Sequence, residues 1–340
     1  MANRLTISNA GKVCHPSSSG MSDVAMLLLF LLAALPAFGW GCAGHQTVAL
    51  VALSQLNPRA DAKVHELLQG QPLPAIHRFC GATTLDVFAD VATWADDERE
   101  VKPRTGEWHF LDIPLEASRE SLATFCEPTI GCVTQAISTQ LDILRPGRGT
   151  RQEQANALMF IVHFLGDLHQ PLHDTTNNDR GANCIPVTLF GQKPKLIDAA
   201  SEGYSPNLHG VWDTELPMRV GKIGDKSRDS DVRKFSAELT SEFASEITTW
   251  QHGPVDLNQW AWDSHELAVT IAYGKLPTPV QTEKPQSVKT CADDNSVGNR
   301  MKALNEDLED PYLGAVTPVI RQQLAKAGTR LSMILNQLWP

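Results

Sequence analysis

The sequence predicts an all-α protein: a single multi-helix domain with at most one small β-hairpin. Most of the chain between residues 40 and 340 has apolar residues at the three- and four-residue spacing of amphipathic helices. Strand-like and helix-like segments do not alternate, so a parallel β-sheet is not expected. The one convincing strand signal is IPVTLFG, residues 185–191, which is compatible with one small hairpin.

The expected helices follow one another with recognisable starts and stops. The first covers residues 44–56 and stops at Asn57-Pro58, because the residue before a proline disfavours helical geometry. The helix over 150–170 begins with Thr150 and Glu153 in capping-box spacing and stops at Pro171. Apolar spacing predicts the other helices, over residues 83–100, 207–216, 230–251, 256–274 and 311–339.

The N-terminal segment differs from the rest of the chain. Residues 24–38, VAMLLLFLLAALPAF, form a run of fifteen residues without a charge. This run is short for a membrane span and has the length of a signal-peptide core. Ala37 and Gly39 are the small residues that a signal peptidase needs, so we expect cleavage between Gly39 and Trp40.

Cleavage there would divide the chain into a signal peptide, residues 1–39, and one domain, residues 40–340. The mature protein would then be secreted or periplasmic. An uncleaved membrane anchor is the alternative interpretation of the same run. The sequence also leaves open whether translation starts at Met1 or at Met21.

The charge and the cysteine content indicate which binding partners and which redox compartment are compatible with the sequence. The formal net charge is −10, which by itself argues against a nucleic-acid partner. The expected domain has six cysteines, and an even number in an exported protein suggests disulfides. Cys126 and Cys132 are close enough to close a small loop. No CxxC pair is present, and the other four cysteines allow three connectivities: Cys42, Cys80, Cys184 and Cys291.

The segment FIVHFLGDLHQPLHD, residues 160–174, places three histidines and two aspartates among apolar residues. Burying such groups is costly unless they are paired or bind a metal. His163 and Asp167 are four residues apart and share a helix face, and imidazole with carboxylate suits Zn²⁺. A buried His–Asp hydrogen bond has the same spacing and would be preferred for an isolated pair.

Further residues of the same kind favour metal binding. His209 and Asp213 repeat the four-residue spacing in LHGVWD, and His173 follows a proline turn. His109 lies in EWHFLDIP and Asp96 in TWADDERE. Together these side chains exceed what one tetrahedral zinc ion can use, so they suggest several metal ions.

The order and spacing of these segments resemble the zinc-dependent single-strand nucleases, which also act as 3′-nucleotidases. That family shares an all-helical fold with the zinc phospholipases C. The resemblance covers nearly all of residues 40–340 and implies three zinc ions per chain. It rests on WGCAGHQTVALVA, WADDER, WHFLDIP, HFLGDLHQPLHD, NLHGVWD and QLAKAGTRLSMILN.

The resemblance also implies which residues bind each ion. The first would be held by Asp96, His109, His163 and Asp167, and the second by His173, His209 and Asp213. The third would be held by His45, the shared Asp167, and the α-amino nitrogen and carbonyl oxygen of Trp40. The amino group of Trp40 exists only after signal-peptide removal; a tryptophan packed in the core is the alternative. His169 matches no ligand position and is expected to be structural or to support a ligand.

The implied reaction is hydrolysis of single-stranded DNA and RNA at P–O3′, leaving 5′-phosphates. Asp96 would orient the nucleophile and Arg99 would steady the charge on the phosphoryl oxygens, unless Arg99 is only a solvated helix end. Phe110 would stack on a base and Asp112 would hydrogen-bond to it, which requires an unstacked base. A core role for Phe110 is the alternative.

Two other functions are compatible with the ligand set. A zinc phospholipase C would share it, but the aromatic residue after His109 and the WADDER segment favour the nuclease. A non-catalytic zinc-binding envelope protein would not need Arg99. The expected partners are therefore single-stranded DNA, RNA and 3′-nucleotides. No stable protein partner is implied, and we expect a monomer.

Overall fold

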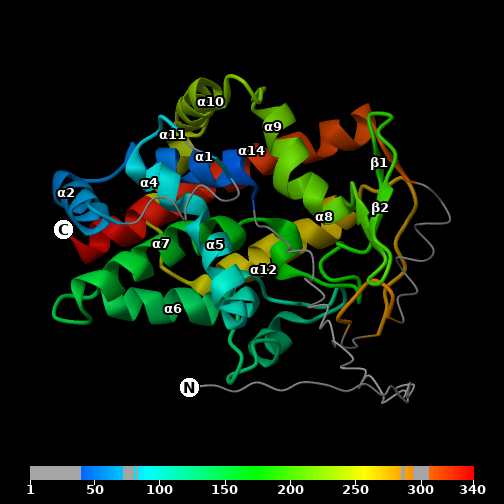
Figure 1. The fold of residues 1–340 in the computed structure, drawn as a ribbon, viewed down its shortest axis with the longest axis horizontal. Coiled ribbons are helices and arrows are strands. Elements are labelled where there is room, and N and C mark those ends of the chain that lie inside the picture. The colour runs from blue at the N-terminus through cyan, green and yellow to red at the C-terminus, as the bar shows by residue number, and fades with distance from the viewer. Residues whose placement is uncertain (1–39, 72–79, 82, 285–287, 294–305) are drawn as a thin grey trace, which may run out of the picture. The chain divides into compact units, whose positions relative to one another are not determined.

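Helices provide nearly all of the regular structure, which confirms the all-α prediction (Figure 1). The computed structural model describes residues 40–71, 80–81, 83–284, 288–293 and 306–340. The predicted signal peptide lies outside the described residues. Among the described residues, no helix combines the length and the apolar character needed to cross a membrane.

The described residues form α-helices (α), short 3₁₀ or π-helical segments (η) and a few short strands (β). The first half of the chain contains α1 (Cys42–Leu53), α2 (Pro58–Leu68), α4 (Val87–Asp90), η2 (Val91–Thr93), α5 (Trp94–Val101), η3 (Pro103–His109), η4 (Arg119–Thr124), α6 (Val133–Leu144), α7 (Arg151–Asp167) and η5 (Pro171–Asp174). The second half contains β1 (Thr188–Leu189), β2 (Lys195–Asp198), β3 (Gly203–Ser205), α8 (Leu208–Gly210), η6 (Val211–Glu215), α9 (Leu216–Val220), α10 (Arg228–Glu242), α11 (Ala244–Gln251), α12 (Leu257–Leu267), η7 (Ala268–Tyr273), β4 (Asp307–Leu308) and α14 (Asp310–Leu338).

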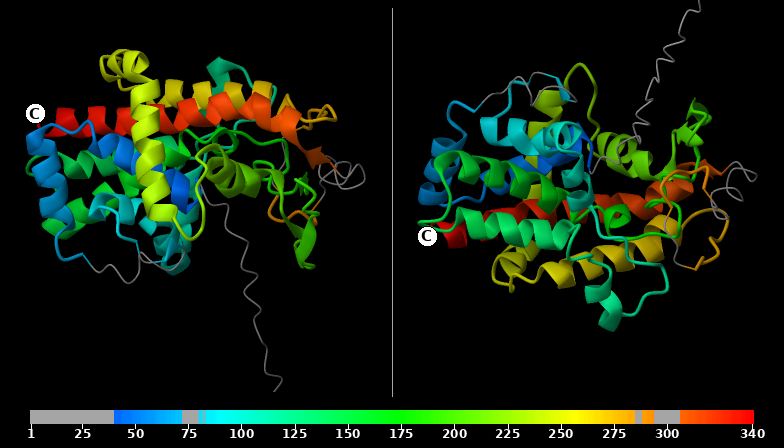
Figure 2. Two further views of the ribbon diagram at one scale, coloured as in Figure 1. Left: turned by 90° about the horizontal axis from the view of Figure 1, so that it is seen from above. Right: turned by 60° about the horizontal axis from the view of Figure 1, so that its bottom comes forward.

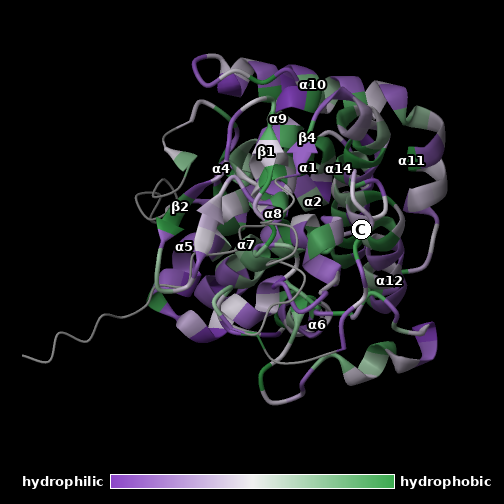
Figure 3. Cartoon of the chain, turned by 90° about the vertical axis from the view of Figure 1, so that its right-hand side faces the viewer, coloured by the Kyte–Doolittle hydropathy of each residue, from purple (hydrophilic) through white to green (hydrophobic). Residues whose placement is uncertain are grey.

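Helices α1 and α14 lie side by side at the centre of this arrangement (Figures 1 and 2). Gly328 permits their close approach, since a Cβ there would lie 2.6 Å from the Cβ of Val51 and 2.7 Å from the carbonyl oxygen of Val48. Helix α7 packs against α1 and α14, and α6 covers α7. Hydrophobic residues line α14 in the interior, whereas α10 carries many hydrophilic ones (Figure 3). The apolar faces of the helices therefore form one continuous core.

The predicted helix over 150–170 matches α7 closely. Thr150 caps it, with its side chain accepting a hydrogen bond from the Glu153 amide and the Glu153 side chain accepting one in return. The last helical residue is Asp167, and Pro171 opens the short helix η5. The Thr150 cap and Pro171 therefore determine where the helix that carries His163 begins and ends.

Several other predictions were incomplete. Helices α2 and α6 were not predicted, although Asn57 caps α2 and Pro58 occupies its first turn. The predicted helix 230–251 is two helices that meet at Phe243, a residue packed against the core. The segments 83–100, 207–216 and 256–274 each contain 3₁₀ or π-helical turns in place of one regular α-helix.

The strand prediction was right in part. Strand β1 lies inside the predicted segment 185–191, but its partner is the distant β4, in parallel. The hairpin-like pair is formed instead by β2 and β3, which are antiparallel. A parallel partner more than a hundred residues away leaves no local signal in the sequence.

All six cysteines of the described chain form disulfides. Cys126 pairs with Cys132, which confirms the predicted small loop. The other two pairs are Cys42–Cys80 and Cys184–Cys291. Cys42 is therefore oxidised and does not offer a thiolate ligand.

Candidate metal centre

Helix α7 brings His163 and Asp167 into the interior on one face, and both side chains are fully buried. His163 Nε2 lies 3.2 Å from Asp167 Oδ2. The other ring nitrogen, Nδ1, donates to the carbonyl of Ala92 at 2.8 Å. This hydrogen bond fixes the ring and directs Nε2 toward Asp167.

Asp96 and His109 join this pair from α5 and η3. His109 Nδ1 lies 3.0 Å from both Asp167 Oδ2 and His163 Nε2. Asp96 Oδ1 lies 3.7 Å from His163 Nε2 and 3.9 Å from His109 Nδ1. Two imidazole nitrogens that face each other across carboxylate oxygens form an arrangement suited to a cation. We call Asp96, His109 and His163 the first cluster.

His173, His209 and Asp213 form the second cluster. The Nε2 atoms of His173 and His209 are 3.1 Å apart, and His209 Nε2 lies 3.4 Å from Asp213 Oδ2. His173 Nδ1 donates to the carbonyl of His109, and His209 Nδ1 donates to that of Gly181 at 2.5 Å. Both Nε2 atoms therefore face the interior of the cluster.

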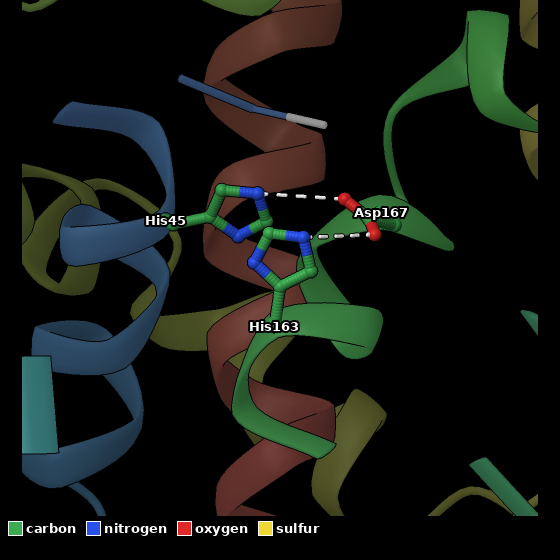
Figure 4. Close-up of side chains that lie close together, drawn as sticks. All are labelled: His45, His163 and Asp167. Atoms are coloured by element: carbon green, nitrogen blue, oxygen red, sulfur yellow. Dashed lines mark ion pairs between the residues drawn. The ribbon is translucent and has the colours of Figure 1, made fainter. Parts of the chain in front are cut away.

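The third cluster contains His45, His163 and Asp167 (Figure 4). His45 Nε2 lies 3.4 Å from Asp167 Oδ1, while the other oxygen of Asp167 faces His163. The rings of His45 and His163 stack at 4.0 Å. Gly166 provides the space, since a Cβ there would lie 2.6 Å from His45 Nδ1. Asp167 thus stands between the first and third clusters.

Trp40 is fully buried at the start of α1. Its Cδ1 lies 3.6 Å from the position of a Cβ on Gly166, beside His45. A Cβ on Gly44 would lie 2.6 Å from the Cβ of Trp40, so this glycine lets the first described residue fold back onto α1.

The first and third clusters leave buried polar atoms without hydrogen-bond partners, which tests whether metal ions fit. Both ring nitrogens of His45, Nε2 of His109, and one carboxylate oxygen each of Asp96 and Asp167 are buried without a hydrogen-bond partner. An unsatisfied buried polar atom costs about 1–3 kcal/mol, and more when charged. Nitrogen and oxygen donors concentrated in this way fit divalent zinc.

Burial and neighbouring charges set the ionisation of these groups. Burial lowers the pKa of His45 and of His109 to about 4, so both rings are neutral at pH 7. Burial also acts on His163, but the charges of Asp167 and Asp96 outweigh it and raise the pKa to about 9. The pKa of Asp167 lies well below its ordinary value, because the neighbouring histidines outweigh the effect of burial.

The predicted catalytic pair lies beside the first cluster. Arg99 is one turn after Asp96 on α5, and its Nη2 lies 3.3 Å from Asp96 Oδ1. Both side chains are buried. Arg99 is therefore not a solvated helix end, and it places a guanidinium against the cluster.

The predicted base-binding residues follow η3. Leu111 and Ile113 are buried while Phe110 is half-buried and Asp112 exposed, an alternation that turns Phe110 and Asp112 away from the core. Phe110 is not a member of the described hydrophobic core. The amide of Leu111 donates to the carbonyl of His173 at 2.8 Å, which ties this segment to the second cluster.

The carboxyl group of Asp112 has a raised pKa. The surrounding protein and the charges of Glu107 and Asp179 raise its pKa to about 7, although Arg180 opposes the shift. Its side chain is nevertheless exposed, so solvent screening limits the effect.

Some contacts of the centre were not predicted from the sequence. The Nε2 atom of Gln170 donates to Asp213 Oδ1 at 2.7 Å, and the carbonyls of Ala92 and Gly181 orient histidines. Gln170 has a sequence signal, since it stands within HQPLHD, but backbone carbonyls have none. His169, two residues after the end of α7, accepts a hydrogen bond from Arg330 of α14 at 2.8 Å and belongs to none of the three clusters.

Comparison with known proteins gives a consistent result. The model of the S1/P1 nuclease family matches residues 40–340. Nuclease P1 of Penicillium citrinum is 27% identical over 317 residues, which cover 88% of this chain and 97% of the relative. Nuclease S1 of Aspergillus oryzae is 28% identical over 317 residues, covering 88% and 91%.

A plant relative is similar over nearly the whole chain. Endonuclease 2 of Arabidopsis thaliana is 24% identical over 338 residues, covering 95% of this chain and 99% of the relative. The match thus spans all three clusters and the helices that carry them, and the chain belongs to the S1/P1 nuclease family.

Proposed function

We propose that this zinc-dependent nuclease hydrolyses single-stranded DNA and RNA at P–O3′, leaving 5′-phosphates, and also removes phosphate from 3′-nucleotides. The observation that carries the proposal is the presence of three buried His/Asp clusters, with the Asp167 carboxylate lying between His45 of the third and His163, which the first and third share. In the reaction a water oxygen bonds to phosphorus, the P–O3′ bond breaks, and a proton goes to O3′.

Three zinc ions per chain are part of this proposal. The first would be held by Asp96, His109, His163 and Asp167, the second by His173, His209 and Asp213, and the third by Trp40, His45 and Asp167. Zinc supplies a Lewis acid that lowers the pKa of water toward neutrality. The unsatisfied nitrogens and oxygens of His45, Asp96, His109 and Asp167 support the first and third sites. The close approach of His173, His209 and Asp213 supports the second.

The chain's own groups would orient the reacting atoms. Asp96 accepts a hydrogen bond from the attacking water and holds it toward phosphorus. Arg99 donates to the phosphoryl oxygens, where negative charge grows in the transition state. Their 3.3 Å separation and burial support a joint role.

Phe110 and Asp112 would bind the nucleobase. A half-buried ring outside the core leaves a face for stacking, and the exposed carboxyl two residues later can hydrogen-bond to the base edge. Stacking contributes about 1–3 kcal/mol per base and accepts every base. A base inside a duplex does not offer its face, which gives the preference for single strands.

We further propose that residues 1–39 are a signal peptide, that residues 40–340 are the mature domain, and that this domain is a secreted or periplasmic monomer. Three disulfides support an oxidising compartment. Cleavage before Trp40 would create the α-amino group that the third zinc site needs.

The proposal is tested by metal content and by substrate choice. Mature protein should contain about three zinc ions per chain and hydrolyse single-stranded DNA but not phosphatidylcholine vesicles, whereas a zinc phospholipase C would do the reverse. Asp96→Asn should keep most of the zinc and lose most of the turnover. One zinc ion per chain, or turnover unchanged in Asp96→Asn, would contradict the proposed centre.

A further inference from the structure

A cavity of about 360 Å³ opens beside the metal clusters. Asp96 of the first cluster and Asp213 of the second both line it. This volume falls in the range of small-molecule sites, about 300–1,000 Å³. The cavity therefore gives a nucleotide-sized space in contact with the groups proposed to act on phosphorus.

The walls of the cavity come from segments far apart in the chain. Gly41 and the disulfide Cys42–Cys80 form one wall, at the start of α1. Thr214 and Met218 line it from η6 and α9. The disulfide and the thioether give an apolar surface, while the threonine hydroxyl is polar.

Arg228, the first residue of α10, brings a cation to this cavity. Its Nε is buried without a hydrogen-bond partner, and its nearest described carboxylate, Asp229, is 3.9 Å away. Oδ1 of Asp229 is the oxygen at this distance, while Oδ2 accepts hydrogen bonds from the amide and hydroxyl of Thr84. The buried Nε of Arg228 therefore keeps a donor for an anion in the cavity, and guanidinium groups match phosphate geometry well.

The described lining of the cavity includes neither Phe110 nor Asp112. A phosphodiester joins two nucleosides, one through O3′ and one through O5′. If Phe110 stacks on the first base, the second nucleotide must leave the clusters in another direction. The cavity adjoins both clusters, and its lining does not involve the Phe110 segment.

We propose that this cavity is a second nucleotide subsite, which binds the nucleotide on the O5′ side of the scissile phosphate and uses Arg228 to hold that nucleotide's own 3′-phosphate. The sugar and base would contact Met218 and the disulfide. Asp225, which also lines the cavity, is exposed to solvent and would not enclose the phosphate. This inference rests on the proposed nuclease function.

The test compares a substrate that needs the subsite with one that does not. Single-stranded hexa-deoxyadenylate has nucleotides on both sides of a scissile phosphate, whereas 3′-AMP has no nucleoside on the O5′ side. In Arg228→Gln, the ratio of kcat/KM for the hexamer to kcat/KM for 3′-AMP should fall by about tenfold, the effect of losing one charge-assisted contact to phosphate. The slope of log KM against log salt for the hexamer should also decrease by about one.

Two further variants complete the experiment. Met218→Trp fills the cavity without changing its charge and should lower the same ratio. Arg145→Gln removes an exposed arginine at the end of α6, outside the cavity lining, and should leave the ratio at the wild-type value. Thermal unfolding of each variant shows whether the fold is intact.

The outcomes separate the two levels of the proposal. If the wild-type protein cleaves neither substrate, the nuclease function is wrong and the subsite with it. If the wild-type protein cleaves both and the ratio is unchanged in Arg228→Gln and Met218→Trp, only the subsite is refuted. An equal fall in Arg145→Gln would mean that net charge, and not the cavity, sets the ratio.

Discussion

Replacing Gly166 by alanine should separate the stability of α7 from the metal site that α7 carries. Alanine is favoured over glycine inside a helix by about 1 kcal/mol. At this position, however, the new Cβ would lie 2.6 Å from Nδ1 and 2.8 Å from Cε1 of His45. Such overpacking costs about 1–3 kcal/mol. The free energy of unfolding should therefore fall by between about 0 and 2 kcal/mol, and the protein should remain folded.

The metal site should respond far more strongly than the fold. The close contact is with the ring of His45, so the ring must move, and its Nε2 is 3.4 Å from Asp167 Oδ1 in the intact structure. We expect Gly166→Ala to lose about one zinc ion per chain after dialysis, and to lose turnover by about 10–100-fold, as displaced ligand supports do. Elemental analysis, urea unfolding and a single-stranded DNA assay measure the three quantities.

Gly314→Ala provides the matched control. Gly314 is also in a helix, α14, and a Cβ there would meet no atom within 4 Å. This variant should gain up to about 1 kcal/mol of stability from helix propensity and keep its full zinc content. Wild-type zinc content and turnover in Gly166→Ala would refute the argument, because they would show that His45 can move without consequence.

The N-terminus, Phe110 and the protonation of His163 each allow a separate test. A protein with one extra residue before Trp40 has an amide in place of the Trp40 α-amino group, so it should bind about two zinc ions. Proteolytic trimming to Trp40 should restore binding of the third ion. Equal zinc content in both forms would exclude the N-terminus as a ligand. Phe110→Ala should weaken binding of single-stranded DNA by about 1–3 kcal/mol with little change in thermal stability; unfolding of the variant would favour a core role instead. Without metal, His163 has a pKa of about 9 and is protonated at pH 7, so zinc binding should release this proton. The affinity for zinc should therefore rise with pH up to about pH 9. Calorimetry in buffers of different ionisation enthalpy measures the proton release, and no release would contradict the raised pKa.

Local signals in the sequence were sufficient for much of this protein. Amphipathic spacing predicted the all-α class, and the Thr150 cap and Pro171 predicted both ends of α7, because hydrogen bonds between near neighbours determine these features. The four-residue spacing of His163 with Asp167 placed both on one helix face for the same reason. The type, spacing and number of these histidines and aspartates made them candidates for metal ligands, and the family resemblance assigned them to zinc sites.

The tertiary structure decided what depends on contacts between distant segments. Cys42–Cys80 and Cys184–Cys291 were one of three possible pairings, and β1 pairs in parallel with β4 from the far end of the chain. Backbone carbonyls of Ala92 and Gly181 orient His163 and His209, and a contact made by a backbone carbonyl leaves no signal that identifies its partner in the sequence. In the sequence, Gly166 is only a residue that lowers the stability of its helix. The structure shows that it makes room for the His45 ring of α1. Sequence periodicity predicts the helix face on which a side chain lies. The residue that this side chain contacts is determined only when the helices pack together.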